Sequence, residues 1–430
     1  MTRTAPERRA SPRRPGTVYV FVLGIGVLLT VIGLAVVALV RLNTRLSEEA
    51  GDGAEAEALA ESAIEYALSA LAEDSNWRTT YTNGTETAAK SLGGGTFTFK
   101  LVDEGDGSLS DDPMDNVRLY GYGRAGAAVR VYSVELKCKK VPLDVLRCAA
   151  HAAGSVVANT TSTVSGGPLS SNASLTVPAA VVVNGDVEAP AVACGGTVTG
   201  TITSGAPVKS MPSTSLYDTY LARATTISYY SLSSGKIDRV VLSPASNPYG
   251  SANSEGIYYV SVPSLNTMTV QNSRLVATLV VYLNTSAKLA TSSNLLWETP
   301  SAGQPALLIR SSGLATVDLQ ASSGWFGEAE IGVNLNPTGT PYNGVSDSDL
   351  FDAYPCEVRG LIHSIGTLYT LAIGGNFKCR GPVICHGPMT VGGGAVLYAN
   401  RALLDSPPEG YYTPGPMVPV AGTWRWETAS

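Results

Sequence analysis

A long uncharged, mostly apolar run opens the pattern of hydrophobic and polar positions along the chain. It covers residues 17–40 and contains no Asp, Glu, Lys or Arg. Folded as an α-helix with a rise of 1.5 Å per residue, this run would be about 36 Å long. That length is sufficient to cross a hydrocarbon core of about 30 Å. The pattern therefore predicts one transmembrane helix over residues 17–40.

Charged residues flank this run asymmetrically. Five arginines precede it, and Arg41 and Arg45 on the other side are followed closely by Glu48 and Glu49. Because basic flanks stay in the cytoplasm, residues 1–16 are expected to form a cytoplasmic Arg-rich tail. The bulk of the chain would then lie outside the inner (cytoplasmic) membrane, in the periplasm or beyond. The alternative is a cleaved signal peptide, although such peptides usually have an apolar region of only about 7–15 residues.

The pattern after the membrane segment is helical and then changes to that of strands. Over residues 54–77, apolar side chains follow one helical face and glutamates follow another, which predicts an amphipathic helix. Gly51 and Gly53 are expected to weaken its join to the membrane helix, because glycine costs about 1 kcal/mol in a helix interior. Three runs with strand character follow, at 95–103, 116–123 and 127–137. Residues 41–140 are therefore predicted to form a helix and a small antiparallel sheet.

This order of segments resembles the pilin-like minor subunits of bacterial pilus and secretion systems, in particular PilX-like minor pilins and K-type minor pseudopilins. The resemblance implies peptidase cleavage after Gly16, with Thr17 as the first mature residue. Pilins carry a glutamate at the fifth mature position, where this chain has Phe21; K-type pseudopilins also lack that glutamate. The resemblance implies a minor subunit of a pilus or type II secretion-like assembly, with the lipid bilayer and other pilin or secretion-platform subunits as partners. The alternative is an ordinary membrane anchor with a pilin-like sequence.

A second domain is expected over residues 145–405, where short β-branched runs end in Gly and Asn turns. Clear examples cover residues 179–187, 195–205 and 357–400. Stacked short strands bury a continuous core that no single turn of the chain can bury, so a right-handed parallel β-helix is predicted. The irregular spacing leaves a β-sandwich as the alternative. Residues 406–430 are rich in Pro and Gly and are expected to form a tail, and the fold class is mainly β with an α+β N-terminal unit.

This second half also resembles an uncharacterised family of bacterial envelope proteins that join a pilin-like N-terminus to a β-helix. The segments that carry this resemblance are residues 256–283, 334–368 and 402–417. The resemblance implies an architecture and a location, and it implies no biochemical activity.

An acidic, glycine-containing stretch covers residues 103–115. Its five aspartates are Asp103, Asp106, Asp111, Asp112 and Asp115. Calcium favours six to eight oxygen ligands from flexible acidic loops, which suits this composition. The spacing does not match the EF-hand pattern, however. We therefore expect a solvated hairpin turn, with a calcium site as the alternative, and predict no metal and no cofactor.

The only carboxylates that suggest catalysis are Asp347, Asp349 and Asp352, with His386 later in the sequence. Paired carboxylates are required for glycoside hydrolysis, but alternating Asp and Ser is also ordinary loop chemistry. The sequence has no nucleophile elbow, zinc-protease, P-loop or dinucleotide fingerprint. We predict a non-catalytic protein with no catalytic residues. The alternatives are an adhesin or carbohydrate-binding β-helix and, less favoured, a polysaccharide lyase or hydrolase. For carbohydrate binding, the contact surface would be formed by Tyr229, Tyr230, Tyr258 and Tyr259.

Charge and cysteine content limit the classes of partner and of covalent or metal crosslink. The formal net charge is −6 and no basic cluster follows residue 14, which argues against nucleic acid as a partner. Six cysteines would lie outside the membrane, where disulfides persist. Cys379 and Cys385 are the candidate disulfide, although pairing cannot be read from sequence. A zinc site and buried free thiols are the alternatives; the zinc ligands would come from Cys356, His363, Cys379, Cys385 and His386.

Overall fold

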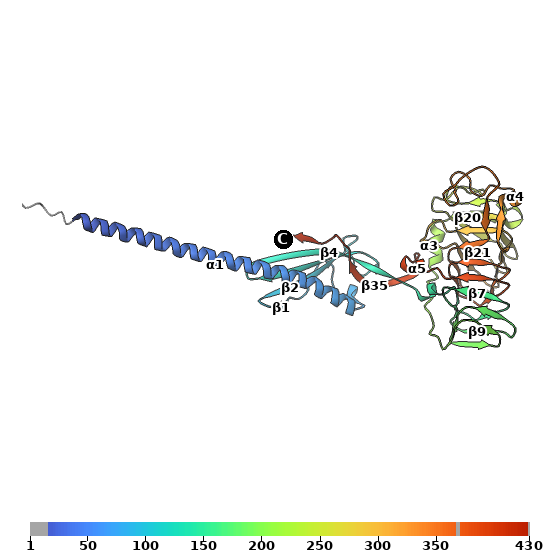
Figure 1. The fold of residues 1–430 in the computed structure, drawn as a ribbon, viewed down its shortest axis with the longest axis horizontal. Coiled ribbons are helices and arrows are strands. Elements are labelled where there is room, and N and C mark those ends of the chain that lie inside the picture. Colours follow the sequence, from blue (N-terminus) through green and yellow to red (C-terminus); the bar gives the residue numbers. More distant parts are fainter. Residues whose placement is uncertain (1–15, 367–369, 429–430) are drawn as a thin grey trace, which may run out of the picture. The chain divides into compact units, whose positions relative to one another are not determined.

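The computed structural model describes residues 16–366 and 370–428, and the chain divides into two compact units (Figure 1). The helix–sheet unit contains the chain up to Lys139 and again from Pro414, and the three-sheet unit contains Lys140–Thr413. The chain is mainly β, as predicted. Residues 406–430 do not form a separate tail, because their strands join the sheet of the helix–sheet unit.

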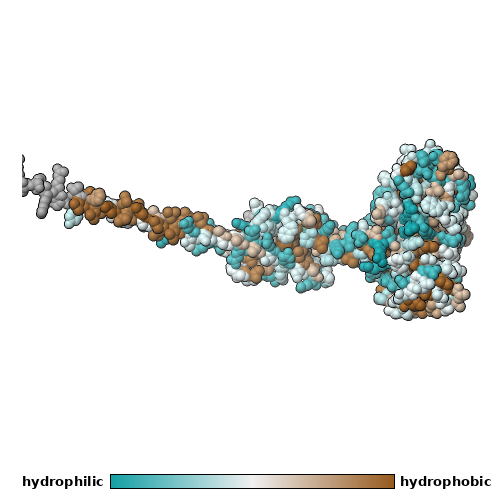
Figure 2. Space-filling view, in the orientation of Figure 1, coloured by the Kyte–Doolittle hydropathy of each residue, from teal (hydrophilic) through white to brown (hydrophobic). Residues whose placement is uncertain are grey.

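Helix α1 (Gly16–Glu73) is one continuous helix of 58 residues. Side chains from Val18 to Ala50 are exposed, and this part is long and apolar enough to cross a membrane. Figure 2 shows a hydrophobic surface along the N-terminal stretch of this part, which gives way to hydrophilic residues before the folded unit. The candidate processing bond between Gly16 and Thr17 lies at the start of α1, whereas residues 1–15 of the predicted tail 1–16 lie outside the described residues.

The expected weak join at Gly51 and Gly53 is wrong, because α1 continues through both glycines. The helix begins to pack against the sheet at this point, and Ala56, Leu59 and Ala60 are buried. Tertiary packing of a helical face contributes more to helix stability than the intrinsic preference of single residues. These contacts therefore offset the cost of two glycines.

The helix–sheet unit has one antiparallel sheet against the second half of α1. Its strand order is β1-β2-β3-β4-β35, and β36 also pairs with β4. The strands are β1 (Lys90–Leu92), β2 (Gly95–Val102), β3 (Val117–Ala125), β4 (Ala128–Pro142), β35 (Tyr412–Pro419) and β36 (Arg425–Glu427), and the short helix α2 (Trp77–Thr80) follows α1. The two C-terminal strands thus cover the free edge of β4, which would otherwise present unpaired backbone groups.

Small residues allow α1 and β3 to approach closely. A Cβ atom on Gly123 would overlap the carbonyl oxygen of Ala56, and one on Gly121 would overlap that of Ala60. Beyond this contact, larger side chains form the core. They are Ile64, Leu71, Trp77, Phe99, Leu101, Leu119, Val134 and Leu136. The glycines of β3 therefore set the distance between the helix and the sheet.

Three parallel sheets are stacked in the second unit, consistent with a β-helix. We name each after its first strand. The β5 sheet contains β5 (Ala150–Ala152), β8 (Leu169–Ser171), β11 (Val187–Ala189), β14 (Ile202–Ser204), β15 (Thr225–Thr226), β18 (Ile257–Val262), β21 (Thr278–Leu283), β24 (Leu307–Ser311), β29 (Ile362–Ile365) and β32 (Val383–Cys385).

The other two sheets have nine strands each. The β6 sheet contains β6 (Val156–Ala158), β9 (Ser174–Val177), β12 (Ala191–Cys194), β16 (Lys236–Asp238), β19 (Thr267–Gln271), β22 (Lys288–Thr291), β25 (Thr316–Leu319), β30 (Thr370–Ile373) and β33 (Met389–Val391). The β7 sheet contains β7 (Ser162–Ser165), β10 (Val182–Asn184), β13 (Thr197–Val198), β17 (Val241–Leu242), β20 (Ser273–Val276), β23 (Leu295–Glu298), β28 (Glu357–Arg359), β31 (Lys378–Arg380) and β34 (Val396–Tyr398).

The winding of this unit is discontinuous. From β5 to β14 the chain visits the three sheets in turn and reaches one edge of the stack. Residues 205–224, which include α3 (Leu216–Arg223), carry it to the opposite edge, where winding resumes at β15. It ends with β32, β33 and β34 pairing with β5, β6 and β7. The first and last turns therefore meet in the middle of the stack.

The outer faces of the sheets are covered differently. Apolar residues of η1 (Asp144–Arg147), α3 and α5 (Ala402–Asp405) pack on the β5 sheet. The β7 sheet carries an excursion of the chain containing β26 (Trp325–Gly327), α4 (Glu328–Ile331) and β27 (Ala353–Pro355). Two further short helical turns, η2 (Tyr229–Ser231) and η3 (Ser233–Gly235), precede β16. Along the β6 sheet buried and partly exposed residues alternate, as in a half-solvated sheet.

Replacing Gly123 by Ala tests the contact between α1 and β3. The added methyl group would push the helix away from the sheet, and overpacking of this kind typically costs about 1–3 kcal/mol. We expect faster hydrogen exchange of the β2, β3 and β4 amides, measured by mass spectrometry on the full chain. Gly51→Ala is the matched control: a Cβ there meets nothing within 4 Å, so helix propensity should leave exchange unchanged or slower. Equal exchange in both variants would contradict the close contact.

Candidate functional site

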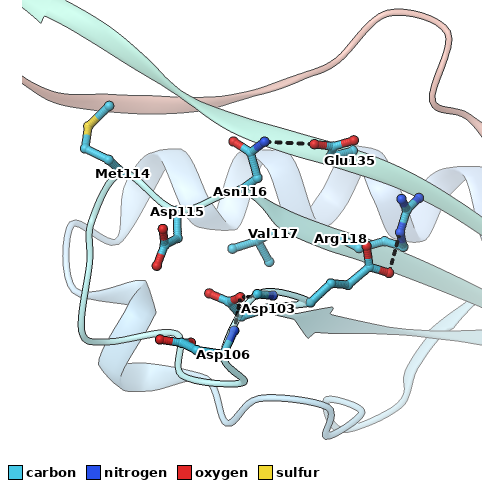
Figure 3. A pocket seen from close by; sticks show the side chains of 10 residues that line it. Asp103, Asp106, Met114, Asp115, Asn116, Val117, Arg118 and Glu135 are labelled. Atoms are coloured by element: carbon cyan, nitrogen blue, oxygen red, sulfur yellow. Dashed lines mark hydrogen bonds and ion pairs between the residues drawn. The ribbon is translucent and has the colours of Figure 1, made fainter.

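The acidic loop, residues 103–115, connects β2 to β3 at one end of the sheet (Figure 3). The two ends of the loop, residues 103–106 and 114–115, line an open pocket of about 670 Å³ together with Asn116, Val117, Arg118 and Glu135. Figure 3 shows the carboxylates of Asp103, Asp106 and Asp115 directed toward the same space. This loop is the strongest candidate site in the described part of the chain.

Two contacts hold the loop on the helix–sheet unit. Leu109 is only 3% exposed and belongs to the core between α1 and the sheet. The Arg78 guanidinium donates hydrogen bonds to the carbonyl oxygens of Leu109 (3.0 Å), Pro113 (3.1 Å) and Asp115 (2.8 Å). The backbone path of the loop is therefore defined, and with it the positions from which the aspartates extend.

Four of the five sequence candidates come together. Asp103, Asp106, Asp111 and Asp115 each offer an oxygen atom, and these atoms lie within 4.8 Å of one another. Asp112 does not belong to this group; its Oδ1 accepts a hydrogen bond from the Met114 amide at 2.7 Å. Asp103 is only 4% exposed. Its Oδ1 accepts hydrogen bonds from the Gly105 amide (2.7 Å) and the Asp106 amide (3.4 Å), whereas its Oδ2 is buried without a partner.

The charges of this group are not neutralised by the described residues. None of the ion pairs found among residues 16–366 and 370–428 includes one of these aspartates, and nearby Arg118 pairs with Glu104 at 2.8 Å. Burial and the charges of the surrounding aspartates raise the pKa of Asp115. A hydrogen bond with Asp106 lowers the pKa of Asp111. Both shifts reflect carboxylates that are close together.

A second acidic group lies on the excursion of the three-sheet unit. Oxygen atoms of Glu328, Asp347 and Asp349 lie within 4.8 Å of one another. The Asn336 Nδ2 donates to Asp347 Oδ2 (3.2 Å) and Asp352 Oδ2 (2.7 Å). Burial and the charge of Asp347 raise the pKa of Asp352. The three aspartates singled out in the sequence are thus neighbours, held by loop hydrogen bonds.

The histidine named with these aspartates lies in a different setting. His386 is beside His363, with ring centroids 5.1 Å apart, and His363 Nδ1 is 2.9 Å from the Tyr411 hydroxyl. His151 Nδ1 is 2.9 Å from Ser170 Oγ. Burial is the largest cause of a lowered pKa for all three histidines; that of His151 is about 4. His151 and His363 are buried residues of β5 and β29, whereas His386 follows β32 and is half-buried.

The cysteines are unpaired in the structure, so the candidate disulfide between Cys379 and Cys385 is not formed. The two residues lie in different sheets, and their thiols contact different carbonyl oxygens, Gly381 at 3.3 Å and Pro388 at 3.8 Å. The candidate zinc ligands do not form a metal-binding group among the described residues. Cys194 is exposed and the other five cysteines are buried.

The tyrosines proposed as a carbohydrate contact surface do not share one environment. Tyr258 is fully buried, and its hydroxyl donates a hydrogen bond to the Ser243 carbonyl oxygen at 2.6 Å. Tyr230 is 83% exposed, with its ring 5.7 Å from that of Tyr229. Alternation along β18 places Tyr258 toward the core, which excludes it from a contact surface.

Sequence reasoning missed a charged network on the β7 sheet. Glu357 is 4% exposed and contacts Arg359 (2.7 Å), Lys378 (2.8 Å) and Arg380 (2.9 Å). Hydrogen bonds from these cations outweigh the effect of burial and lower the pKa of Glu357 to about 2. Parallel pairing places Arg359 beside Arg380. The sequence signal that could have revealed this network is the repeat of charged residues at 357–359 and 378–380, each followed by glycine.

The buried histidines predict acid sensitivity of the three-sheet unit. The pKa of His151 is about 4 in the folded chain and about 6.5 when unfolded, so the unfolded state binds more protons between these values. Stability is therefore full above pH 6.5 and is lost as the pH falls toward 4. We expect the midpoint of thermal unfolding to fall from pH 7 to pH 5, and His151→Gln to reduce that fall. A midpoint that does not change over this range would contradict the prediction.

Thiol labelling tests the cysteine assignment. Burial raises the pKa of Cys385 to about 11 and that of Cys148 to about 12, and it is the thiolate that reacts with maleimide. We expect one label per native chain, at Cys194, and six in denaturant. Cys194→Ser should abolish native labelling, and a mass that reveals a disulfide between Cys379 and Cys385 would contradict the structure.

Comparisons with known proteins give distant structural neighbours. No protein-family model matches the sequence, and no curated protein matches it either. An ice binding protein from an Antarctic biological consortium is 14% identical, with a TM-score of 0.28 over 60% of this chain and 91% of the other. The competence-associated pilin ComZ from Thermus thermophilus is 12% identical, with a TM-score of 0.27 over 88% of this chain and 98% of the other. At these TM-scores neither similarity establishes a family.

Proposed function

We propose that this protein is a membrane-anchored, pilin-like minor subunit or scaffold protein of the bacterial cell envelope, in a pilus or a type II secretion-like assembly. In this role it is non-catalytic. Its partners are the lipid bilayer and other pilin or secretion-platform subunits. The β-helix, which we take to be right-handed as nearly all parallel crossovers are, serves as the domain presented outside the membrane.

The observation that carries this proposal is the difference in surroundings between the two parts of α1. The first part of the helix is apolar and exposed, and the second part forms the core of the helix–sheet unit. An exposed apolar helix of this length is stable in a bilayer or against other apolar helices. Because α1 is one continuous helix, a displacement of its membrane part moves the helix–sheet unit with it.

The placement of the three-sheet unit in the sequence supports a scaffold role. It is inserted between β4 and β35, so both ends of the insertion are strands of one sheet. The described histidine that is hydrogen-bonded to a serine, His151 with Ser170 at 2.9 Å, is buried together with that serine, so the pair is closed to a substrate. The Arg-rich N-terminus favours insertion with that end in the cytoplasm and the folded units outside the inner membrane.

Determining the mature N-terminus tests this proposal most directly. We expect the chain in the membrane fraction, extracted by detergent and retained by high salt, with a mass that begins at Thr17. Gly16→Leu should remain in the membrane with an intact N-terminus. A wild-type chain that keeps its N-terminus would indicate an ordinary anchor, and one that begins near Leu39 would indicate a released protein.

The assembly partner can be tested in the same preparation. We expect crosslinks from the exposed part of α1 to pilin or secretion-platform subunits in intact cells. Recovery as a soluble monomer would contradict the proposal.

A further inference from the structure

We propose that the acidic loop between β2 and β3 binds a calcium ion through Asp103, Asp106, Asp111 and Asp115. This inference concerns the folded helix–sheet unit and does not depend on the proposed function. It rests on a buried carboxylate oxygen without a partner, on uncompensated charge and on the size of the site.

The buried oxygen is the observation that distinguishes this loop from an ordinary acidic turn. Asp103 is only 4% exposed, and its Oδ1 already accepts two backbone hydrogen bonds. Its Oδ2 has no partner. Figure 3 shows this carboxylate directed toward the space shared with Asp106 and Asp115. A buried charged oxygen without a hydrogen bond is costly, and coordination to a cation would remove that cost.

The second argument is the accumulation of negative charge. The acidic loop contains six carboxylates and no Lys or Arg. In the described part of the chain, the four converging aspartates have no ion pair; Arg118, which lines the same pocket, pairs with Glu104 through its Nε. The four carboxylates repel one another, because their oxygen atoms lie within 4.8 Å. A bound divalent cation would convert this repulsion into attraction.

The dimensions and the ligand type favour calcium. Calcium–oxygen distances are about 2.3–2.6 Å, so ligands on opposite sides of the ion are about 4.6–5.2 Å apart. The four carboxylate oxygens lie within 4.8 Å of one another. Second carboxylate oxygens and water would complete six to eight ligands in the open pocket. Zinc prefers Cys and His ligands, and magnesium requires a near-ideal octahedron, which four side chains on one loop do not supply.

Calcium would stabilise the position of the whole loop. Asp103 follows β2, Asp115 precedes β3, and Asp106 and Asp111 lie between them, so one ion would join both ends of the loop. Between these ligands, Leu109 enters the core of the helix–sheet unit. Coordination would therefore oppose local opening that exposes this core. Extracellular calcium modules have dissociation constants of about 10⁻⁴–10⁻³ M, which is the range we expect here.

The test uses the full-length chain, purified in detergent and dialysed against EDTA and then against metal-free buffer. Isothermal titration with CaCl₂ is expected to show saturable binding, and hydrogen exchange of residues 103–117 is expected to slow at least severalfold at saturation. MgCl₂ at the same concentration should produce a smaller effect. Absence of both a binding isotherm and protection with calcium would overturn the proposal.

Three variants separate coordination from general charge effects. Asp103→Asn and Asp106→Asn each keep an oxygen for their backbone hydrogen bonds and remove a charged ligand. The apparent calcium affinity, measured from protection of the loop against hydrogen exchange, should therefore fall at least tenfold. Asp112→Asn removes the same charge from the same loop and keeps its hydrogen bond to Met114. Its apparent calcium affinity should fall less than threefold. Exchange in EDTA reports whether each variant is folded.

Two results would contradict the assignment of the site. Equal losses in Asp112→Asn and Asp103→Asn would indicate diffuse attraction of counterions. Calcium binding that survives Asp103→Asn and protects residues 328–352 in place of 103–117 would assign the ion to the second acidic group.

Discussion

The pairing of the last turn of the three-sheet unit with its first turn is the constraint on which the architecture depends. Strands β32, β33 and β34 pair with β5, β6 and β7, so the chain enters and leaves the stack at its middle. The entering and leaving segments are consequently neighbours, and the Leu143 amide donates a hydrogen bond to the Tyr411 carbonyl oxygen at 3.0 Å. A unit with adjacent ends can be inserted between two strands of another sheet without disrupting the pairing of that sheet. A stack wound from one edge to the other would separate those ends by its full length.

Local signals in the sequence predicted the elements well. The apolar run at 17–40 predicted the membrane-compatible part of α1, and the period-two runs predicted β2, β3 and β4. The same runs located the connection between β2 and β3, which is the acidic loop. These predictions succeeded because length, hydropathy and periodicity are properties of contiguous residues.

The sequence did not predict features that arise from distant pairing. The order of winding depends on residues 205–224 crossing the stack, which no local pattern reports. Strands β35 and β36 resembled a Pro/Gly-rich tail because their partner, β4, is almost 300 residues away, as in the bond between Ser133 and Glu427. The continuity of α1 through Gly51 and Gly53 depends on contacts with β3. The buried, unpartnered Oδ2 of Asp103 is likewise visible only when the loop is folded.

The two principal carboxylate environments of the protein show why composition alone cannot define a site. Glu357 is buried with Arg359, Lys378 and Arg380, so its charge is satisfied within the fold and its pKa is low. Asp103 is equally buried but makes no ion pair among the described residues. A folded protein can stabilise a buried charge with its own side chains or with an ion from solution. The stability of the helix–sheet unit is therefore linked to the ions in its surroundings, whereas the charged network of the β7 sheet requires no ion from solution.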